Sequence, residues 1–251
     1  MKKNNNFYKM NSMLYSDCEQ IKASFNKEIA IKVQNIISKK VDLRDYVDIN
    51  EIEGKVLVGL DASYLNNGLG IGVAVAIKYP QYDIIDCDIT IRKVCIPYIP
   101  GLLAFREMYL LVPSLLNILK KVKPYVLFVD GHGYAHPRFA GIATHIGVVF
   151  NTPTIGVAKK RLVGEETIKN GDIYLKIGEK LVSKILLIKN KKIYISPGNK
   201  ISLETSFNIA KIMSGNSKLP IPIYIADRIS KIAKNHIDPN LDCKKFIDKI
   251  K

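Results

Sequence analysis

The sequence predicts an α/β fold in which a mixed sheet carries helices on both faces. Three strand-like runs, residues 56–62, 70–79 and 82–96, follow one another closely along the chain. The joints between them are too short for crossover helices, so the three strands should be antiparallel neighbours. Beyond them the pattern changes to an alternation of helices and short apolar strands, which completes a mixed α/β arrangement.

The first part of the chain is expected to hold an arm and two helices around these strands. Residues 1–14 are interpreted as a flexible arm, and residues 15–251 as a single domain. Apolar residues recur at helical spacing up to Lys40, and Ser16 or Asp17 could cap the helix that they predict. A further helix is predicted over residues 102–121, where Pro113 should kink it or start a new turn.

The second part alternates between apolar strands and helices and ends in two helices. The predicted elements are strands 125–130 and 153–158, a helix over 138–150, a basic hairpin with strands 181–189 and 192–195 around Asn190 and Lys191, and helices 203–213 and 225–235. This order matches the ribonuclease-H-like fold. The sequence shows no internal repeat, low-complexity tract or obvious linker.

The charge balance favours a polyanionic partner. The chain carries 38 Lys and Arg against 23 Asp and Glu, a formal net charge of +15. It has no run of about 20 apolar residues that could span a membrane, no apolar signal-peptide core, and no basic amphipathic helix with bulky anchors. We therefore expect a soluble, cytoplasmic monomer without a membrane partner.

The four cysteines, Cys18, Cys87, Cys95 and Cys243, are scattered along the chain without a C-x-x-C pair. A zinc site or a disulfide framework is the alternative interpretation. The spacing favours reduced thiols without a structural role, in agreement with a cytoplasmic location.

Two acids follow apolar runs that should form central strands. Asp61 comes after residues 56–60 and Asp130 after residues 126–129. A single acid at a strand end is often a cap or a turn former, but two acids on central strands of one sheet, if held close, would repel each other unless a cation neutralised them. Hard oxygen ligands of this kind suit Mg²⁺, with Mn²⁺ as a substitute.

Two further acids have simple structural explanations. Glu107 lies near the start of a predicted helix, where the helix dipole favours an acid. Asp227 precedes Arg228 and could form a surface ion pair. Spacing alone does not select either residue as functional.

The sequence around these acids resembles that of the endonuclease V family, and the resemblance covers roughly residues 20–232. Five blocks carry the resemblance: residues 58–64 (VGLDASY), 97–107 (PYIPGLLAFRE), 129–138 (VDGHGYAHPR) with 141–147 (GIATHIG), 153–160 (PTIGVAKK), and 196–198 (SPG) with 225–227 (IAD). The resemblance implies a ribonuclease-H-like fold. It also implies a metal-dependent endonuclease of DNA repair, which recognises hypoxanthine and hydrolyses the second phosphodiester bond on its 3′ side.

The resemblance also implies roles for individual residues. Asp61, Glu107, Asp130 and Asp227 match the family's acidic metal site, Tyr98 its wedge tyrosine, and His136 and Lys159 the polar residues at the cleavage site. The chain departs from the family pattern at two places. Asn199 follows the Ser-Pro-Gly turn where a histidine is usual, and Ile221 lies between two prolines where a glutamate is usual. These departures concern local phosphate contacts or helix docking rather than the metal acids.

The chemistry of these residues fits that assignment. Lys159, followed by Lys160 and Arg161, could stabilise developing negative charge, although a basic triplet can also be a solvated turn. His136 could donate a proton to the phosphate or the leaving oxygen, and a zinc site with His132 is not expected across Gly133.

Recognition of the base is predicted at two loops. Tyr98 and Ile99 lie between Pro97 and Pro100, which stiffen the loop so that the ring can wedge between bases. We expect the backbone of Gly131 and Gly133 to approach the base and, with Leu102 and Leu103, to form the pocket. Hypoxanthine and adenine present opposite donor patterns, so unpaired polar groups would reject adenine.

Three alternatives remain open from the sequence. The chain could be an inosine-specific ribonuclease, since partners of this family include DNA and RNA containing inosine. It could be another nuclease of the same fold, such as the related half of an excision-repair incision protein, or a non-catalytic basic nucleic-acid-binding protein.

The glycines at 68, 70 and 72 precede a strand and do not open a helix, so they predict a hairpin turn and not a dinucleotide site.

Overall fold

A mixed sheet forms the centre of the computed structural model, which describes residues 18–238 and 241–249. Its strands are β1 (Val56–Tyr64), β2 (Leu69–Lys78), β3 (Asp83–Lys93), β4 (Val126–Asp130), β5 (Thr154–Ala158), β6 (Glu165–Lys169), β7 (Asp172–Ile177), β8 (Lys180–Ile188) and β9 (Lys191–Asn199). In the described part of the chain they pair in the order β3-β2-β1-β4-β5-β9-β8-β7-β6. The first three strands are antiparallel and β1, β4 and β5 are parallel, which confirms the prediction.

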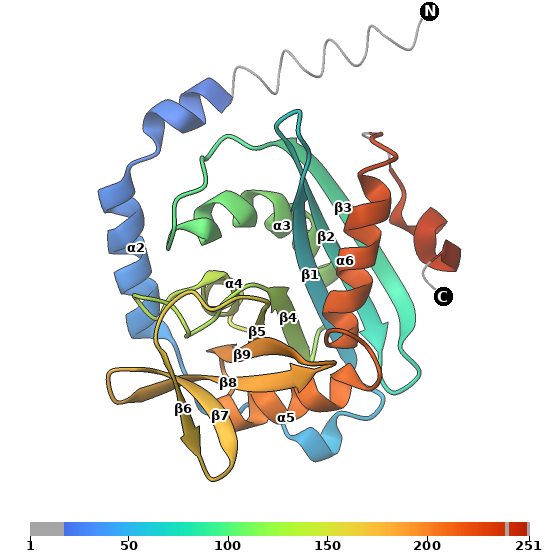
Figure 1. Ribbon diagram of the computed structural model, residues 1–251. Helices are drawn as coiled ribbons and strands as arrows, with labels where there is room; N and C mark the ends of the chain where they lie inside the picture. The colour runs from blue at the N-terminus through green and yellow to red at the C-terminus, as the bar shows by residue number, and fades with distance from the viewer. Residues whose placement is uncertain (1–17, 239–240, 250–251) are drawn as a thin grey trace, which may run out of the picture.

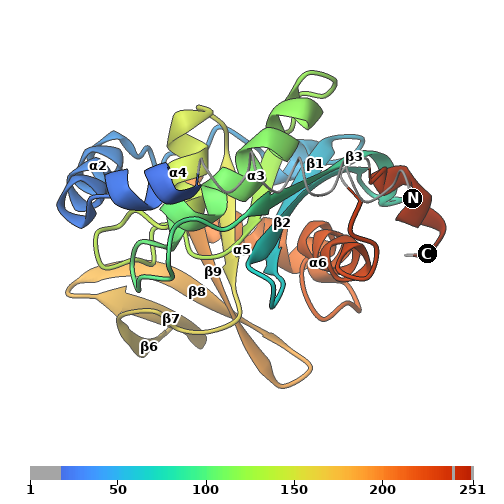
Figure 2. The same cartoon turned by 90° about the horizontal axis from the view of Figure 1, so that it is seen from above.

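Helices cover both faces of this sheet (Figures 1 and 2). They are α2 (Lys27–Lys40), α3 (Leu103–Leu119), α4 (Ile142–Val149), α5 (Leu203–Ser214) and α6 (Ile221–Ala233), with short 3₁₀ helices η1 (Ile49–Glu51) and η2 (Cys243–Lys249). Successive strand residues point to opposite faces. Val58 and Leu127 therefore pack with α3 and α4, whereas Leu57 and Phe128 pack with α5 and α6.

The glycines of the first hairpin are structural, as the sequence predicts. Gly68 lies in the β1–β2 turn with a φ of 81°. A Cβ at Gly72 would lie 2.2 Å from the carbonyl oxygen of Leu110, so this glycine lets α3 pack directly on β2.

The N-terminal helix differs from its prediction. Residues 18–24 are helical, the helix is interrupted at residues 25 and 26, and α2 begins at Lys27. The Asn26 side chain accepts a hydrogen bond from the Ile29 N–H, so Asn26 caps a new helix instead of continuing the first one. The expected caps Ser16 and Asp17, like the arm over residues 1–14, lie outside the described residues.

Two other elements have boundaries that differ from the predicted ones, and the backbone conformation explains both differences. The helix predicted from Arg138 begins only at Ile142, because Phe139 has a left-handed φ of 53°. The turn of the basic hairpin is formed by Lys189 and Asn190, with φ of 48° and 62°, and not by Asn190 and Lys191.

The hairpin of β6 and β7 was missed by the sequence analysis. Its turn is Asn170-Gly171, and both residues have positive φ, 52° and 82°. An Asn-Gly pair between two strands is a strong hairpin signal, so the prediction was available from the sequence.

The expectation of reduced cysteines is wrong for this structure. Cys18 pairs with Cys95, and Cys87 pairs with Cys243, across sequence separations of 77 and 156 residues. The second disulfide joins β3 to η2. Four cysteines allow three pairings, and only the folded chain brings these partners together.

Among the described residues, no helix has both the length and the apolar character that crossing a bilayer requires.

Candidate active site

Asp61 and Asp130 lie side by side where the parallel pairing of β1 with β4 ends: Asp130 is the last residue of β4, whereas β1 continues past Asp61 to Tyr64, so Asp61 is not at a strand end as predicted. The register pairs Leu60 of β1 with Val129 of β4, so the acid that follows each residue projects from the same edge. Asp61 is buried, and its Oδ2 accepts a hydrogen bond of 2.6 Å from the Ser230 hydroxyl on α6. Burial, together with the neighbouring Asp130 carboxylate, holds the pKa of Asp61 well above its usual range.

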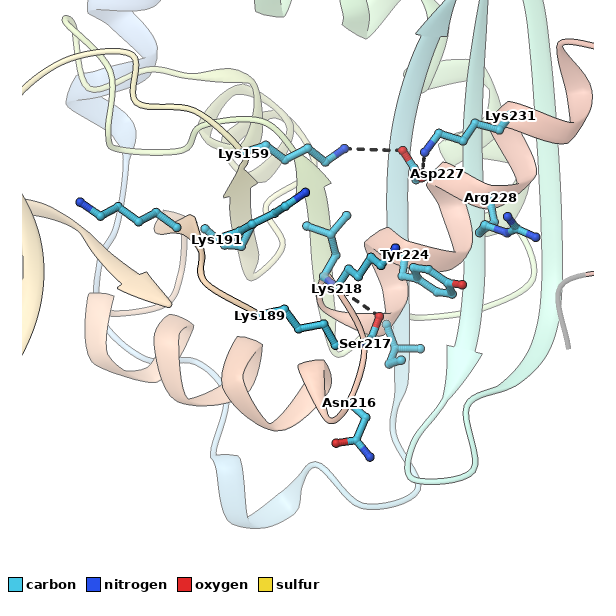
Figure 3. A pocket seen from close by; sticks show the side chains of 14 residues that line it. Lys159, Lys189, Lys191, Asn216, Ser217, Lys218, Tyr224, Asp227, Arg228 and Lys231 are labelled. Atoms are coloured by element: carbon cyan, nitrogen blue, oxygen red, sulfur yellow. Dashed lines mark hydrogen bonds and ion pairs between the residues drawn. The ribbon is translucent and has the colours of Figure 1, made fainter. Parts of the chain in front are cut away.

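Lys159 joins these acids to helix α6. Its Nζ lies 2.6 Å from Oδ2 of Asp130 and 3.6 Å from Oδ1 of Asp227. Figure 3 shows the contact with Asp227, which also pairs with Lys231. Burial lowers the pKa of Lys159, but the carboxylates of Asp130, Asp61 and Asp227 outweigh it and raise the pKa overall. The ammonium is therefore charged and neutralises part of the acidic cluster.

Glu107 supplies the fourth carboxylate from the second turn of α3. It is buried, and the Tyr64 hydroxyl donates a 3.1 Å hydrogen bond to its Oε1. Burial raises the pKa of Glu107 to about 8, although this hydrogen bond acts in the opposite direction. We call Asp61, Glu107, Asp130 and Asp227 the acidic cluster.

The acidic cluster has the chemistry of a divalent-cation site, but it is not closed around one position. In the described part of the chain, no three acidic, histidine or cysteine side chains stand close enough to enclose a metal ion. Lys159 lies between Asp130 and Asp227 instead. The donors are all carboxylate oxygens, which are the ligands that hard divalent cations prefer, so the residues fit Mg²⁺ or Mn²⁺.

The predicted wedge residue Tyr98 stands at the rim of a cavity of about 250 Å³. Its side chain is 63% exposed. Gly101, Leu103, Ala104 and Ile142 contribute much of the apolar lining, and residues 160–162 form another wall. Because residue 159 contacts the acidic cluster, the cavity and the cluster are joined by consecutive residues.

The Tyr98 loop is anchored through one carbonyl group. The oxygen of Gly101 accepts hydrogen bonds from Gln34 Nε2 at 2.9 Å and from Arg138 Nη2 at 2.7 Å. Gly101 itself has a φ of 76°, a conformation that glycine adopts without strain. Helix α2 and the loop after β4 thus hold the end of the Tyr98 loop in place.

His136 has a different environment from the one expected of a proton donor. It is buried, and its Nδ1 accepts the Arg138 N–H at 3.2 Å, so Nε2 must carry the proton that it shares with Gly101 O at 3.0 Å. Burial lowers the pKa of His136 to about 4. Both nitrogens are engaged, and in this arrangement the residue positions the Tyr98 loop and has no proton available for a leaving group.

The predicted pocket residues divide into two groups. Leu103 and Tyr98 line the cavity, whereas Gly131, Gly133 and Leu102 do not. The N–H of Gly131 donates to Val157 O and that of Gly133 to the Ser196 hydroxyl, so neither N–H is free to read a base.

Close packing explains why residue 133 is a glycine, and the other predicted residues lie in or beneath the Tyr98 loop. A Cβ at Gly133 would lie 2.2 Å from Pro197 O, so a side chain cannot fit. Leu102 is buried beneath the loop, and its N–H donates to Ile99 O. Pro97 and Pro100 are exposed on either side of Tyr98.

The sequence did not point to three residues that hydrogen-bond to the site: Tyr64 to Glu107, Ser230 to Asp61, and Gln34 to the Gly101 carbonyl of the Tyr98 loop. Ser230 follows Asp227 by three positions on a helix, which places both on one face and could have been noticed. Tyr64 and Gln34 gave no local signal, because their partners lie 43 and 67 residues away.

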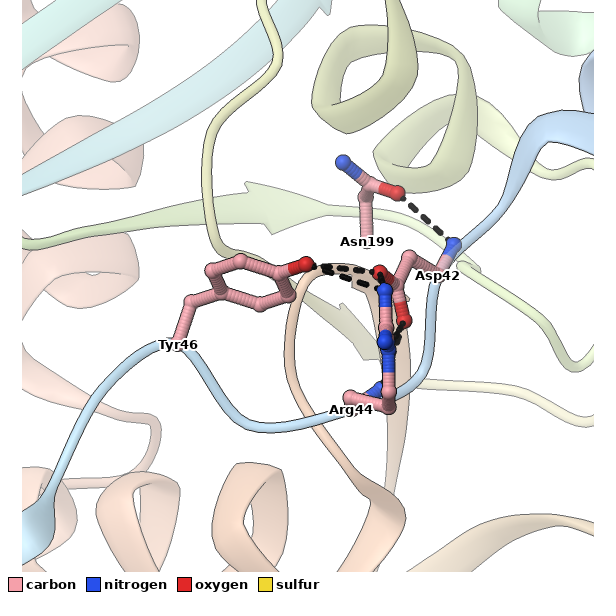
Figure 4. Close-up of polar contacts among 4 residues, drawn as sticks. All are labelled: Asp42, Arg44, Tyr46 and Asn199. Atoms are coloured by element: carbon pink, nitrogen blue, oxygen red, sulfur yellow. Dashed lines mark hydrogen bonds and ion pairs between the residues drawn. The ribbon is translucent and has the colours of Figure 1, made fainter.

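Asn199, the first departure from the family pattern, has a structural role (Figure 4). It is buried, its Oδ1 accepts the Asp42 N–H at 3.1 Å, and its Nδ2 donates to Gly147 O at 2.9 Å. It thereby joins β9 to α4 and to the segment after α2.

The second departure, Ile221, begins α6 between two prolines. A Cβ at Gly59 of β1 would lie 2.0 Å from Pro222 O, so α6 starts in direct contact with the sheet. Proline in the first helical turn is favourable, and helix docking does not require the usual glutamate.

Comparison with known proteins identifies the family of this chain. A family model described as Endonuclease V matches residues 35–228. The chain belongs to the endonuclease V family. It is 39% identical over 221 residues to the endonuclease V of Aeropyrum pernix, covering 87% of this chain and 84% of that protein. It is 40% identical over 210 residues to that of Ignicoccus hospitalis, covering 83% and 95%.

Solved structures agree with the sequence comparisons. The endonuclease V of Bacillus subtilis superimposes with a TM-score of 0.75 at 25% identity, covering 85% of this chain and 94% of that one. That of Ciona intestinalis, in complex with a 24mer DNA containing an inosine followed by a ribo-adenosine, gives 0.73 at 29% identity, covering 85% and 100%. The fold of this endonuclease V is therefore ribonuclease-H-like, and the protein is a nuclease, a hydrolase that acts on DNA.

Proposed function

We propose that this endonuclease V nicks a DNA strand at a deaminated adenine, cutting the second phosphodiester bond on the 3′ side of the hypoxanthine with the help of Mg²⁺ or Mn²⁺. The observation that carries the proposal is the continuity of residues 159–162. Lys159 contacts the acidic cluster, and the next three residues line the Tyr98 cavity. A base in the cavity would bring a nearby phosphate of the same strand to the carboxylates.

The roles of the residues follow from their environments. Asp61 and Asp130, with Glu107 and Asp227, would hold the cation. A bound divalent cation would neutralise the carboxylates and stabilise the charge that builds up on the phosphate. Lys159, held between Asp130 and Asp227, would add a second positive charge beside the scissile bond.

The base would leave the stack before cleavage. The cavity is mostly apolar and about 250 Å³ in volume, a size that suits a flipped base. The exposed ring of Tyr98 at its rim would fill the gap left in the strand.

A second candidate substrate is inosine-containing RNA. The Ciona intestinalis relative was solved with a ribo-adenosine directly after the inosine. Matched inosine strands of DNA and RNA, cleaved under the same conditions, would rank the two substrates.

For the DNA substrate, the expected result is nicking of the strand that contains inosine and no nicking of a matched strand that contains adenine.

The test of the proposal uses Asp130→Asn, with Asp83→Asn, an exposed acid on β3, as the matched control. Asp130→Asn and chelation of divalent ions should each reduce nicking to background, while the control keeps the wild-type rate. The product length reports which bond is cut. Undiminished turnover by Asp130→Asn in Mg²⁺, or equal nicking of inosine and adenine strands, would refute the proposal.

A further inference from the structure

A basic groove of about 680 Å³ lies beside the acidic cluster. Its lining residues come largely from α6, the loop before it and the β8–β9 hairpin, whereas the lining of the Tyr98 cavity includes Gln34 of α2. Helices α6 and α2 lie on opposite sides of the view in Figure 1. Lys159 and Asp227 both line the groove and point toward each other in Figure 3, so the groove adjoins the acidic cluster.

Besides Lys159, positive charge from three separate segments meets in this groove. Among the described residues, seven basic side chains and one acidic side chain, Asp227, line it. The β8–β9 hairpin supplies Lys189 and Lys191, the loop before α6 supplies Lys218, and α6 supplies Arg228.

Much of this charge has no acidic partner. Lys192 pairs with Glu166, and Lys231 pairs with Asp227. By contrast, Lys189, Lys191, Lys218 and Arg228 form no ion pair with any residue in the described ranges. Like charges gathered without partners raise the local potential, and a polyanion in the groove would relieve their repulsion.

The wall that carries these lysines is ordered. Ile188 pairs with Lys191 across a two-residue turn, and Lys189 and Asn190 both have positive φ, as a type I′ turn requires. The hairpin is a direct extension of the central sheet through β9 and β5. Its lysines are therefore presented at a fixed place relative to Asp130.

The groove also contains apolar and aromatic surface. Tyr224, Ile193 and Leu219 line it together with the basic side chains. Basic residues beside an aromatic ring are the combination that binds a single strand, because the cations contact phosphates and the ring can stack on a base.

We propose that this groove binds the phosphodiester backbone of the cleaved strand on the 3′ side of the scissile bond. The inference rests on the proposed function, which places the base in the Tyr98 cavity and the cut on its 3′ side. A strand that runs from the cavity across the acidic cluster enters the groove in its 3′ direction. The 5′ flank leaves from the opposite side and does not reach it.

The experiment compares two inosine strands of equal length, one extended mainly on the 3′ side and the other on the 5′ side. The enzyme variant replaces Lys189, Lys191 and Lys218 with alanine. All three are exposed and form no ion pair within the part of the chain that the structure describes, so the fold should persist. The matched control replaces Lys78, Lys120 and Lys123, which are exposed at the opposite end of the sheet.

The KM for nicking should rise about tenfold or more on the 3′-extended strand and change less than about threefold on the 5′-extended strand, with kcat unaltered. The slope of log KM against log salt should fall by about 2, since three phosphate contacts to a single strand are removed. The control variant should match the wild type on both strands.

The outcomes separate this inference from the proposed function. If the wild type fails to nick either inosine strand, the proposed function is wrong. If the wild type nicks both, and the triple variant leaves KM unchanged or raises it equally on both strands, the groove assignment is overturned. Should the triple variant unfold, the single variant Lys218→Glu gives the same comparison, again with a selective rise in KM expected.

Discussion

The ammonium of Lys159 lies 2.6 Å from Oδ2 of Asp130, and this contact joins the end of β5 to the end of β4. The same Nζ lies 3.6 Å from Asp227 on α6. One side chain thus holds acids from the sheet and from a helix near one another. In a divalent-metal reaction the lysine would compete with the cation for Asp130 and would also assist it at the phosphate.

Replacement of Lys159 by methionine should separate these two effects. Loss of its charge should lower kcat about 100-fold, because a group that stabilises the transition state is removed. The Mg²⁺ concentration needed for half-maximal rate should fall, because the ammonium no longer competes for Asp130. Steady-state nicking over a Mg²⁺ titration measures both, and Lys169→Met, an exposed lysine on β6, is the control. An unchanged kcat would contradict the assigned role.

Tyr98 should contribute through its ring. Tyr98→Ala should weaken binding of an inosine strand about tenfold, which is the usual scale for one stacking contact, while some cleavage persists. Tyr98→Phe keeps the ring and should bind nearly as well as the wild type. Fluorescence anisotropy with a labelled strand measures both affinities. Equal binding by the wild type and Tyr98→Ala would exclude the wedge role.

His145 on α4 should make the protein less stable in acid. Its ring is buried against Phe105, with ring centroids 5.3 Å apart, and burial lowers the pKa of His145 from 6.5 to about 4. Between these values the unfolded chain binds more protons than the folded chain, so the free energy of unfolding falls as pH drops from 6.5 toward 4.

The test is the difference in the free energy of unfolding between pH 7 and pH 5. His145→Gln removes the titrating group, so this difference should shrink by up to about 2 kcal/mol relative to the wild type. Urea titrations of the wild type and of His145→Gln at both pH values provide the four free energies of unfolding that the comparison needs. The comparison is insensitive to the packing cost of the substitution, because that cost appears at both pH values. An identical pH dependence in the two proteins would count against the burial argument.

The disulfide between Cys87 and Cys243 should stabilise the fold without affecting catalysis. It closes a segment of 156 residues and holds η2 on β3, at the sheet edge away from β4. Replacing both cysteines by alanine should lower the free energy of unfolding by about 3 to 5 kcal/mol, the range expected for a long closed loop.

Thermal unfolding with and without a reductant checks this prediction. The wild type should lose stability in the reductant, and the double variant should lose less, since only the Cys18–Cys95 bond remains to be reduced. Nicking rates of the two oxidised proteins should agree. If the unfolding midpoint of the wild type were the same with and without the reductant, the result would argue against the pairing of Cys87 with Cys243.

The sequence by itself determined the features that depend on neighbouring residues. The short joints between the first three strands required an antiparallel arrangement, and the apolar runs before Asp61 and Asp130 predicted that both acids lie on central strands, although only Asp130 ends its strand. Two prolines around Tyr98 predicted its exposed loop, and the excess of basic residues predicted a polyanionic partner. Backbone sterics and side-chain periodicity act over a few residues, which is why these features could be predicted.

The tertiary structure decided the contacts between distant segments. It paired the cysteines, engaged both nitrogens of His136, and set Ser230 against Asp61 across 169 positions. It also brought Lys189, Lys218 and Arg228 to one groove beside the acidic cluster. Such contacts arise from the packing of α6 and the hairpins on the sheet, and no local pattern encodes which surfaces will meet.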